Sequence, residues 1–329
     1  MEDFIVDKKI RRIGILTSGG DAPGMNAVVR AVVRSATANG ITCLGVRRGY
    51  NGLINGDVME LDARSVDGIS KKGGTILYTA RCLEFMTEEG LQKAVNTCKY
   101  LGLDAIVTVG GDGTFKGAQK LSRAGIPAIG IPATIDNDIT CTDYTIGFDT
   151  AQNTAIDAID KLSDTMQSHE RCSIVEVMGR EAGHLALNVG IATGATAILV
   201  PERELDLETD IVDKMRRGKI RGRNHHVIIV AEGFGNVDEI RQEIYDLTGI
   251  ETRLTILGHI QRGGSPSCMD RVIATSMGAY ATKIIMEGKS NRVICYKNNR
   301  VTDFDIEEGL SMEKDLDKEL YNVSKMVSH

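Results

Sequence analysis

The 329-residue chain contains no tryptophan, five prolines and few aromatic residues, which make up 4% of the sequence. No run of about 20 apolar residues occurs, so a membrane-spanning helix is not expected. The N-terminal stretch MEDFIVDKKIRR lacks the apolar segment of a signal peptide. These absences predict a cytoplasmic protein with no membrane partner.

Cysteine pairs of the C-x-x-C type are also missing, although the chain has seven cysteines. Their odd number and wide scatter predict neither a disulfide framework nor a zinc site. The net charge of −6 and the absence of basic blocks argue against nucleic acid as a partner. An acidic protein that binds anionic substrates has to gather its arginines locally.

The sequence does contain a repeated alternation of β-branched runs, glycine-rich turns and helical stretches. This order predicts an α/β fold with two lobes, each built on a mostly parallel sheet flanked by helices. A length of 329 residues suits two domains of about 100–200 residues each. A helix is expected over 25–38, and a long helix near 148 marks the change of lobe. Strands are expected at 13–17, 41–46, 104–109, 127–131, 172–177, 197–200 and 227–231.

Two glycine-rich turns each join a predicted strand to a predicted helix, at Gly19-Gly20 and at Gly110 to Gly113. Backbone N–H groups in such turns bind phosphate, although neither turn matches a P-loop or a dinucleotide fingerprint. Either turn alone could be a tight connection without a ligand. Asp112 favours a ligand site, because a carboxylate among phosphates requires a bridging Mg²⁺.

The predicted strand 127–131 is followed by Thr134-Ile-Asp136-Asn-Asp138. Two carboxylates at a strand end could hold a metal, or one could be a general base for an acceptor hydroxyl. A surface turn in which Asp and Asn side chains cap their own backbone is the other interpretation.

Five segments carry a family resemblance because they occur together and in order. They are Thr17–Asn26, Gly110–Gly113, Pro132–Asp138, Glu176–Arg180 and Leu257–Gly264. With them the chain resembles the bacterial-type ATP-dependent 6-phosphofructokinases over essentially its whole length. The GGDG turn alone would also suit NAD kinases and diacylglycerol kinases.

The resemblance implies phosphoryl transfer from MgATP to the 1-hydroxyl of fructose 6-phosphate, the committed step of glycolysis. It implies a phosphofructokinase-like fold with a larger ATP-binding lobe, 1–147 plus about 261–311. The smaller sugar-phosphate-binding lobe would be 148–260 plus about 312–329. It also implies a homotetramer whose sites are shared across subunits.

The resemblance also implies which residues form the site, through the positions that match the family's motifs. The ATP site would comprise Gly20, Tyr50, Arg81, Cys82, Gly111, Asp112, Gly113 and Thr114, with Asp112 as the Mg²⁺ ligand. The catalytic set would be Asp136 as proton acceptor with Thr134, Asp138, Arg81 and Arg171. The sugar phosphate would meet Thr134, Asp136, Arg171, Met178, Gly179, Arg180, Glu232, Arg253, His259 and Arg262. Forked guanidinium groups suit phosphate oxygens, and Arg171 and Arg253 would reach the 6-phosphate across a subunit boundary. His259 could instead be a structural histidine.

The phosphoryl donor is expected to be ATP. Pyrophosphate-using relatives carry Asp where this chain has Gly113 and Lys where it has Ala133, and glycine leaves room for a nucleotide. The alternatives are a pyrophosphate-dependent phosphofructokinase, a lipid or NAD kinase with the same turn, and a catalytically inactive nucleotide sensor.

An allosteric site for ADP or phosphoenolpyruvate is matched only in part. Its matching residues are Arg30, Arg34, Arg221, Arg223 and His225. The chain departs from the family at Ala63 and Ser163, where arginines are usual, and at Thr196, where an acid is usual. We expect the usual effectors to bind weakly, or another ligand to use this site, because charge-assisted phosphate bonds are lost. The alternative is that Arg30 and Arg34 form an exposed helix face.

Overall fold

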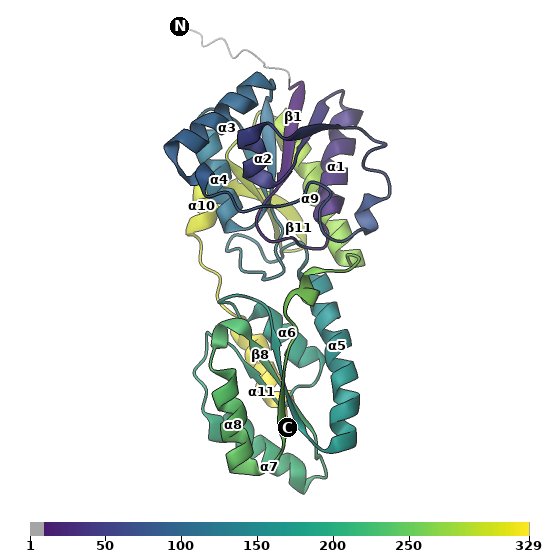
Figure 1. Ribbon diagram of the computed structural model, residues 1–329, viewed down its shortest axis with the longest axis vertical. Coiled ribbons are helices and arrows are strands. Elements are labelled where there is room, and N and C mark those ends of the chain that lie inside the picture. The colour runs from purple at the N-terminus through teal and green to yellow at the C-terminus, as the bar shows by residue number, and fades with distance from the viewer. Residues whose placement is uncertain (1–9, 329) are drawn as a thin grey trace. The chain divides into compact units, whose positions relative to one another are not determined.

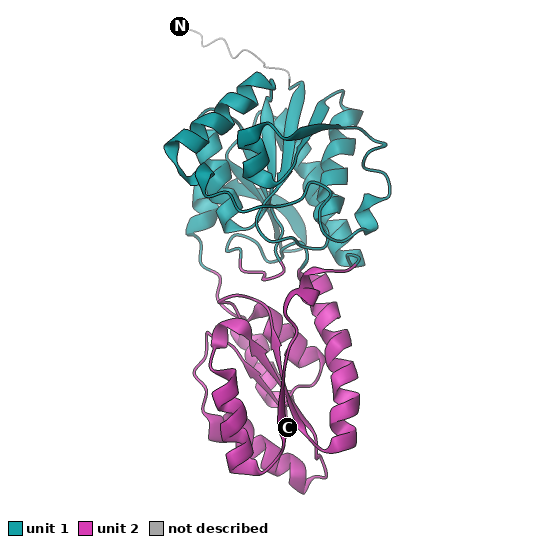
Figure 2. Ribbon diagram, in the orientation of Figure 1, with its two compact units in different colours: residues 1–134, 139–147, 265–313 teal, residues 135–138, 148–264, 314–329 magenta. Residues whose placement is uncertain are grey.

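The computed structural model describes residues 10–328, and the chain forms two compact units (Figure 2). Unit 1 comprises residues 1–134, 139–147 and 265–313, and unit 2 comprises 135–138, 148–264 and 314–329. The chain therefore passes between the units after residues 134, 138, 147, 264 and 313. The stretch through residue 9, where we predict no signal peptide, lies outside the described residues.

Within the described chain, unit 1 has a seven-stranded sheet in the order β11-β10-β5-β4-β1-β2-β3. Its strands are β1 (Arg12–Thr17), β2 (Thr42–Val46), β3 (Val58–Leu61), β4 (Ala105–Gly110), β5 (Ala128–Pro132), β10 (Arg292–Lys297) and β11 (Arg300–Asp305). The inner strands pair in parallel, whereas β2–β3 and β10–β11 pair antiparallel. The predicted, mostly parallel α/β sheet is confirmed.

Helices cover both faces of this sheet (Figure 1). They are α1 (Met25–Ala38), α2 (Gly49–Asn55), α3 (Glu88–Tyr100), α4 (Asp112–Arg123), α9 (Cys268–Met286) and α10 (Ile306–Ser311). α1 has the predicted bounds and packs closely on α9, because a Cβ at Gly278 would lie 2.8 Å from that of Ala31. α1, which follows the turn after β1, is therefore fixed by close packing against α9.

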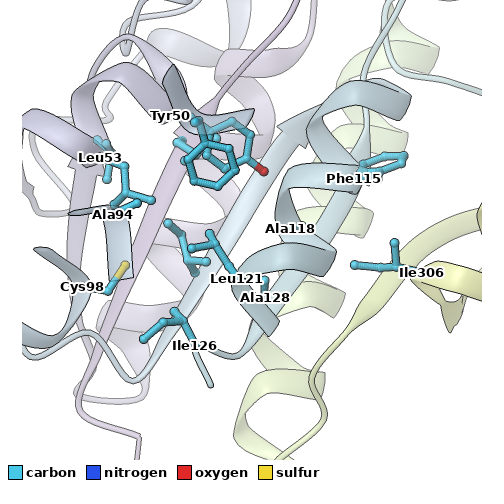
Figure 3. Packing of buried hydrophobic residues seen from close by; sticks show 14 of the residues in the cluster. Tyr50, Leu53, Ala94, Cys98, Phe115, Ala118, Leu121, Ile126, Ala128 and Ile306 are labelled. Atoms are coloured by element: carbon cyan, nitrogen blue, oxygen red, sulfur yellow. The ribbon is translucent and has the colours of Figure 1, made fainter. Parts of the chain in front are cut away.

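The opposite face of the sheet is filled by apolar side chains from α2, α3, α4 and α10 (Figure 3). Tyr50, Leu53 and Leu121 are almost fully buried there. Each such side chain contributes about 1.5–3 kcal/mol of burial free energy. A Cβ at Gly130 would lie 2.6 Å from the Phe115 ring, so this strand position needs glycine. The start of α4 is thereby fixed against the sheet.

Unit 2 has a parallel sheet in the order β7-β8-β6-β9. Its strands are β6 (Cys172–Val177), β7 (Ala197–Leu199), β8 (His226–Ala231) and β9 (Thr252–Ile256). Its helices are α5 (Phe148–His169), α6 (His184–Ala192), α7 (Asp213–Ile220), α8 (Val237–Thr248) and α11 (Lys318–Val327). Apolar residues of α7 and α8 pack on one face of the sheet, and α11 packs on α6. Among residues 10–328, no helix combines the length and apolar character needed to cross a membrane.

Candidate functional site

Two glycine turns lie side by side at the carboxyl ends of β1 and β4, which are parallel neighbours in unit 1. The Ser18 N–H donates to the Val109 carbonyl at 2.9 Å, and Thr114 Oγ1 donates to the Ser18 carbonyl at 3.3 Å. A Cβ at Gly110 would lie 2.3 Å from the Ser18 carbonyl oxygen. Only glycine allows this approach, so the two turns form one continuous backbone surface.

The second turn opens directly into α4, whose N-terminus favours an anion. No heavy atom lies within 4 Å of a Cβ placed at Gly113, and Gly111 has a single neighbour at 3.9 Å, in Ile139. The turn therefore borders open space large enough for a ligand to approach the backbone.

Asp112 is half-buried in the first turn of α4. Within the described residues, no group of three or more His, Cys, Asp or Glu side chains could hold a metal. Mg²⁺ commonly binds one or two carboxylates together with substrate phosphates and water. A single carboxylate beside a phosphate-binding turn therefore fits Mg²⁺ that arrives with a nucleotide.

Tyr50 supports α4 from the core rather than lining open space. Its hydroxyl donates to the Thr114 carbonyl at 2.6 Å, and its ring stacks on Phe85 with centroids 4.1 Å apart. A Cβ at Gly117 would lie 2.5 Å from the Tyr50 ring. Burial raises the pKa of Tyr50, so the hydroxyl remains a donor at neutral pH.

The remaining predicted ATP-site residues lie near the first turn in sequence or in space. Gly20 is exposed in that turn. Thr79 Oγ1 donates to the Gly19 carbonyl at 2.6 Å, which brings the segment that carries Arg81 and Cys82 to this turn. Arg81 is exposed and Cys82 is half-buried against the core of unit 1.

In unit 2 the predicted general base is buried beside an arginine. Asp136 is 2% exposed, and Arg180 Nε lies 3.5 Å from its Oδ2. Arg180 also places Nη1 3.8 Å from Asp138 Oδ2, while its side chain stays 61% exposed. We call residues 135–138 the Asp136 loop. Thr134, which precedes it, belongs to unit 1, where its carbonyl accepts a hydrogen bond from Thr145 Oγ1 at 2.7 Å.

Left-handed backbone conformations occur at Arg180 and at Asn137, the residue after Asp136. Asn137 has φ of 53° and Arg180 has φ of 54°; this conformation is uncommon for an arginine, whereas asparagine adopts it more readily. Gly179 has φ of 141°, and a Cβ there would lie 2.6 Å from the Ala182 carbonyl oxygen. The turn after β6 is therefore shaped to present Arg180.

Glu232, at the end of β8, orients the same turn by accepting a hydrogen bond from the Arg180 N–H at 2.6 Å. Burial, together with the charge of Glu232, raises the pKa of Glu176 at the end of β6. Met178, Gly179, Arg180 and Glu232 are thus brought together with Asp136 as predicted positions around one site.

A fully buried amide that we did not predict links this turn to the segment with His259 and Arg262. Gln261 Oε1 accepts from the Met178 N–H at 3.4 Å, and its Nε2 donates to the Gly258 carbonyl at 3.1 Å. His259 is exposed and Arg262 is half-buried. In the sequence, Gln261 stands between Ile260 and Arg262, and this local context does not reveal that its side chain is buried.

Arg171 and Arg253 lie together but apart from Asp136. Arg171 Nε donates to Glu251 Oε2 at 2.7 Å, and Glu251 also pairs with Arg253. Arg171 precedes β6 while Met178 follows it, so six residues of strand, about 20 Å, separate them. Within one chain the two arginines therefore do not join the site, and Glu251 is a partner that we did not predict.

The predicted effector residues of unit 1 lie on α1. Arg30 is half-buried, and Arg34 pairs with Asp67 at 3.2 Å on the surface. Ala63 and Ser163, at positions where arginine is usual, are half-buried in units 1 and 2 respectively.

The predicted effector residues of unit 2 lie around the end of α7. Arg221 lines a cavity of about 150 Å³ together with Lys214, Arg217 and Gly218. Arg223 donates to the Gly194 carbonyl at 3.4 Å, and burial, aided by the charge of Arg223, lowers the pKa of His225.

Thr196, where the family usually has an acid, points into the protein. Its side chain is 2% exposed, and its hydroxyl lies 3.3 Å from Nδ1 of the buried His226. A buried hydroxyl cannot replace an exposed carboxylate as a ligand for an effector-bound cation.

Comparison with known proteins shows which family the sequence matches. The phosphofructokinase model matches residues 12–285. The ATP-dependent 6-phosphofructokinase of Clostridium botulinum strain Hall is 52% identical over 319 residues, 97% of this chain and 100% of that protein. The protein of the same name from Clostridium novyi strain NT is 54% identical over 320 residues, again 97% and 100%.

Solved structures agree with the sequence comparison. Phosphofructokinase from Saccharomyces cerevisiae is 33% identical, with a TM-score of 0.87, over 96% of this chain and 46% of the yeast chain. A pyrophosphate-dependent phosphofructokinase from Marinobacter aquaeolei, 21% identical with a TM-score of 0.83 over 94% and 86% of the two chains, shares the fold. With the glycine turns of unit 1 and the Asp136–Arg180 pair of unit 2, these matches show that the chain belongs to the phosphofructokinase family.

Proposed function

We propose that this chain is an ATP-dependent 6-phosphofructokinase. It transfers the γ-phosphoryl group of MgATP to the 1-hydroxyl of fructose 6-phosphate, the committed step of glycolysis. Relatives that carry this name match it over their full length. The observation that carries the proposal is the buried Asp136 carboxylate beside Arg180, in a loop that follows a strand of unit 1.

Asp136 acts as the general base. The 1-oxygen of the sugar forms a bond to the γ-phosphorus, the bond to the β-bridging oxygen of ATP breaks, and the hydroxyl proton passes to Asp136. Arg180 Nε lies 3.5 Å from Oδ2 of this carboxylate and pairs with its charge. Thr134 and Asp138 flank the reacting groups.

Unit 1 binds the nucleotide. Backbone N–H groups of Gly20, Gly111 and Gly113 bind the phosphates, and Thr114, Tyr50 and Cys82 shape the site. Arg81 faces the transferring phosphoryl group, where electrostatic stabilisation contributes most. Asp112 would hold Mg²⁺, which when bound neutralises charge on the phosphate oxygens.

Unit 2 binds the sugar phosphate through Met178, Gly179, Arg180, Glu232, His259 and Arg262. Arg171 and Arg253 act on the 6-phosphate of a neighbouring subunit, because within their own chain they lie about 20 Å from the turn after β6. The functional form is a homotetramer, in which a neighbouring subunit supplies these arginines, and it works in the cytoplasm.

Regulation by ADP or phosphoenolpyruvate is weak in this chain. The cations at Arg30, Arg34, Arg221, Arg223 and His225 remain, but Ala63, Ser163 and the buried Thr196 supply no charge. Titrating both effectors at subsaturating sugar phosphate tests this. A strong response of activity to either compound would contradict it.

A coupled assay on fructose 6-phosphate with MgATP and magnesium pyrophosphate in parallel tests the proposed reaction. We expect product formation with ATP and at most trace activity with pyrophosphate. Turnover with pyrophosphate alone would favour the pyrophosphate-dependent class, and no turnover with either donor would refute the proposal.

A further inference from the structure

The Asp136 loop receives a hydrogen bond from a residue 177 positions away in the chain. Lys314 Nζ donates to the backbone carbonyl of Asn137 at 2.7 Å. Lys314 is the first residue of the segment that returns to unit 2 before α11. It lies outside all five segments that carry the family resemblance.

The accepting carbonyl belongs to the residue with the unusual backbone conformation. Asn137 has φ of 53° and is 6% exposed, so its backbone is left-handed and shielded from water. A charged donor forms a stronger hydrogen bond to such a carbonyl than a neutral donor does. The Lys314 ammonium therefore stabilises the conformation that places a carboxylate on each side of Asn137.

The segment that carries Lys314 is itself well anchored. Leu316 is 4% exposed, and Asp317 caps α11 by accepting from the Leu320 N–H at 2.9 Å. Thr140, which follows the loop, donates to the carbonyl of Gly309 at 2.8 Å in unit 1. The chain after the loop is thus bonded to the chain before Lys314, and the loop itself is bonded to Lys314.

The positive charge of Lys314 also affects His184, another residue of unit 2. Burial, reinforced by this ammonium, lowers the pKa of His184 to about 4. His184 is therefore neutral at physiological pH, and the cations placed beside the Asp136 loop are Arg180, on its carboxylates, and Lys314, on its backbone.

We propose that Lys314 is a positioning residue for the general base. Its hydrogen bond to the Asn137 carbonyl holds the peptide after Asp136, and so orients the carboxylate toward the acceptor hydroxyl. The inference rests on the proposed function, in which Asp136 removes the proton. A displacement of about 1 Å at a reacting group lowers the rate about 100-fold, so a backbone bond of this kind affects turnover more than substrate affinity.

Steady-state kinetics with MgATP and fructose 6-phosphate test this in three variants. Lys314→Met should lower kcat about 30-fold or more while KM for the sugar phosphate changes less than about threefold. Lys314→Arg, which keeps a charged donor, should recover most of kcat. Lys318→Met is the matched control, because Lys318 is exposed and pairs only with Asp315 among the described contacts, at 3.2 Å, and it should leave both constants unchanged.

A kcat for Lys314→Met within twofold of wild type would overturn the inference. So would a Lys314→Arg protein as impaired as Lys314→Met.

Amide hydrogen exchange in the absence of substrate separates this inference from the proposed function. Exchange in the Asp136 loop should be about tenfold faster in Lys314→Met, with β6 unchanged, because local opening is governed by local bonds. Unchanged exchange in the loop would refute the role of Lys314 even if wild type is an active kinase. Wild type without kinase activity would refute the proposed function, and the exchange result would still decide whether Lys314 holds the loop.

Discussion

We call the proposed nucleotide-binding surface of unit 1 the nucleotide half and the proposed sugar-phosphate-binding surface of unit 2 the sugar half. The two surfaces are built by opposite means. In unit 1 the proposed surface is backbone, uncovered at Gly111 and Gly113, closely packed on Ser18 at Gly110 and supported from the core by Tyr50. In unit 2 the surface is charged side chains, with Asp136, Arg180 and Glu232 holding one another. The first half should therefore select by the space it leaves, and the second by the charges it presents.

The two units also differ in their histidine content. All six histidines of the chain lie between 169 and 329, and those in the described residues belong to unit 2. Changes in stability near pH 6 should therefore originate in the sugar half. Variants in each half test this contrast.

Removing the carboxylate at the centre of the charged half should have the largest effect. Asp136→Ser is expected to lower kcat by about 10³-fold, within the usual range for a general base. KM for fructose 6-phosphate should change little, because Arg180 and Glu232 keep their own bond. Steady-state kinetics measure both constants, and a fully active variant would remove Asp136 from the mechanism.

Placing a side chain in the open space beside Gly113 should affect only the use of the phosphoryl donor. Gly113→Asp places a carboxylate where no atom lies within 4 Å, so folding should be unaffected. Repulsion from the phosphates should lower kcat/KM for ATP about 100-fold. Unchanged use of ATP would mean that the nucleotide does not lie over this turn.

Gly110→Ala is the matched control for that variant. Its Cβ would lie 2.3 Å from the Ser18 carbonyl oxygen, so it should destabilise the fold by about 1–3 kcal/mol. Thermal unfolding of both variants separates a loss of space for the ligand from a loss of structure.

Unit 2 should lose stability in mild acid through its buried histidines. Burial, with smaller effects of Arg223 and His225, lowers the pKa of His226 from 6.5 to about 4. Between these values the unfolded chain binds a proton that the native protein does not, so stability falls as the pH falls from 6.5 toward 4 and then levels off. At pH 5 this linkage amounts to about 2 kcal/mol.

His226→Gln should remove this component of the pH dependence. Urea unfolding at pH 7.5 and pH 5, at one protein concentration, should show a smaller loss in the variant than in wild type. His169→Gln, at an exposed site, is the control and should behave as wild type does. Equal losses in wild type and His226→Gln would contradict the assignment to His226.

Tyr50→Phe should have the smallest effect, because Tyr50 supports the nucleotide half from behind. Loss of its hydrogen bond to the Thr114 carbonyl should lower the free energy of unfolding by about 1 kcal/mol. KM for ATP should rise less than about threefold, since a buried hydroxyl does not touch the ligand. A tenfold rise would instead place Tyr50 in direct contact with the nucleotide.

Local sequence pattern was sufficient to predict most of the buried strands. Each of the seven predicted strands begins and ends within one residue of the observed strand, because buried parallel strands are continuous β-branched runs. β3, β9, β10 and β11 were not predicted. β10 (Arg292–Lys297) is an inner strand with a buried apolar centre, so its sequence carried a signal that we did not use. β9 (Thr252–Ile256) and β11 (Arg300–Asp305) keep exposed or half-buried side chains and lie at sheet edges, so their sequences carry little apolar signal.

Side-chain partners were harder to predict than the site positions themselves. Glu251 meets Arg171 only because β6 and β9 align Cys172 with Thr252. Gln261 and Lys314 reach their carbonyl or N–H partners through tertiary folding. Such contacts depend on register and on distant segments, which no local pattern contains.

The interleaving of the two units has a consequence for synthesis of the protein. β5 ends at Pro132, whereas its sheet neighbour β10 begins at Arg292, 160 residues later. At roughly 5–20 residues per second, a ribosome needs about 10–30 s to cover that interval. During this time the nascent chain exposes a bare apolar strand edge, the kind of surface that chaperones shield and that otherwise pairs with other chains.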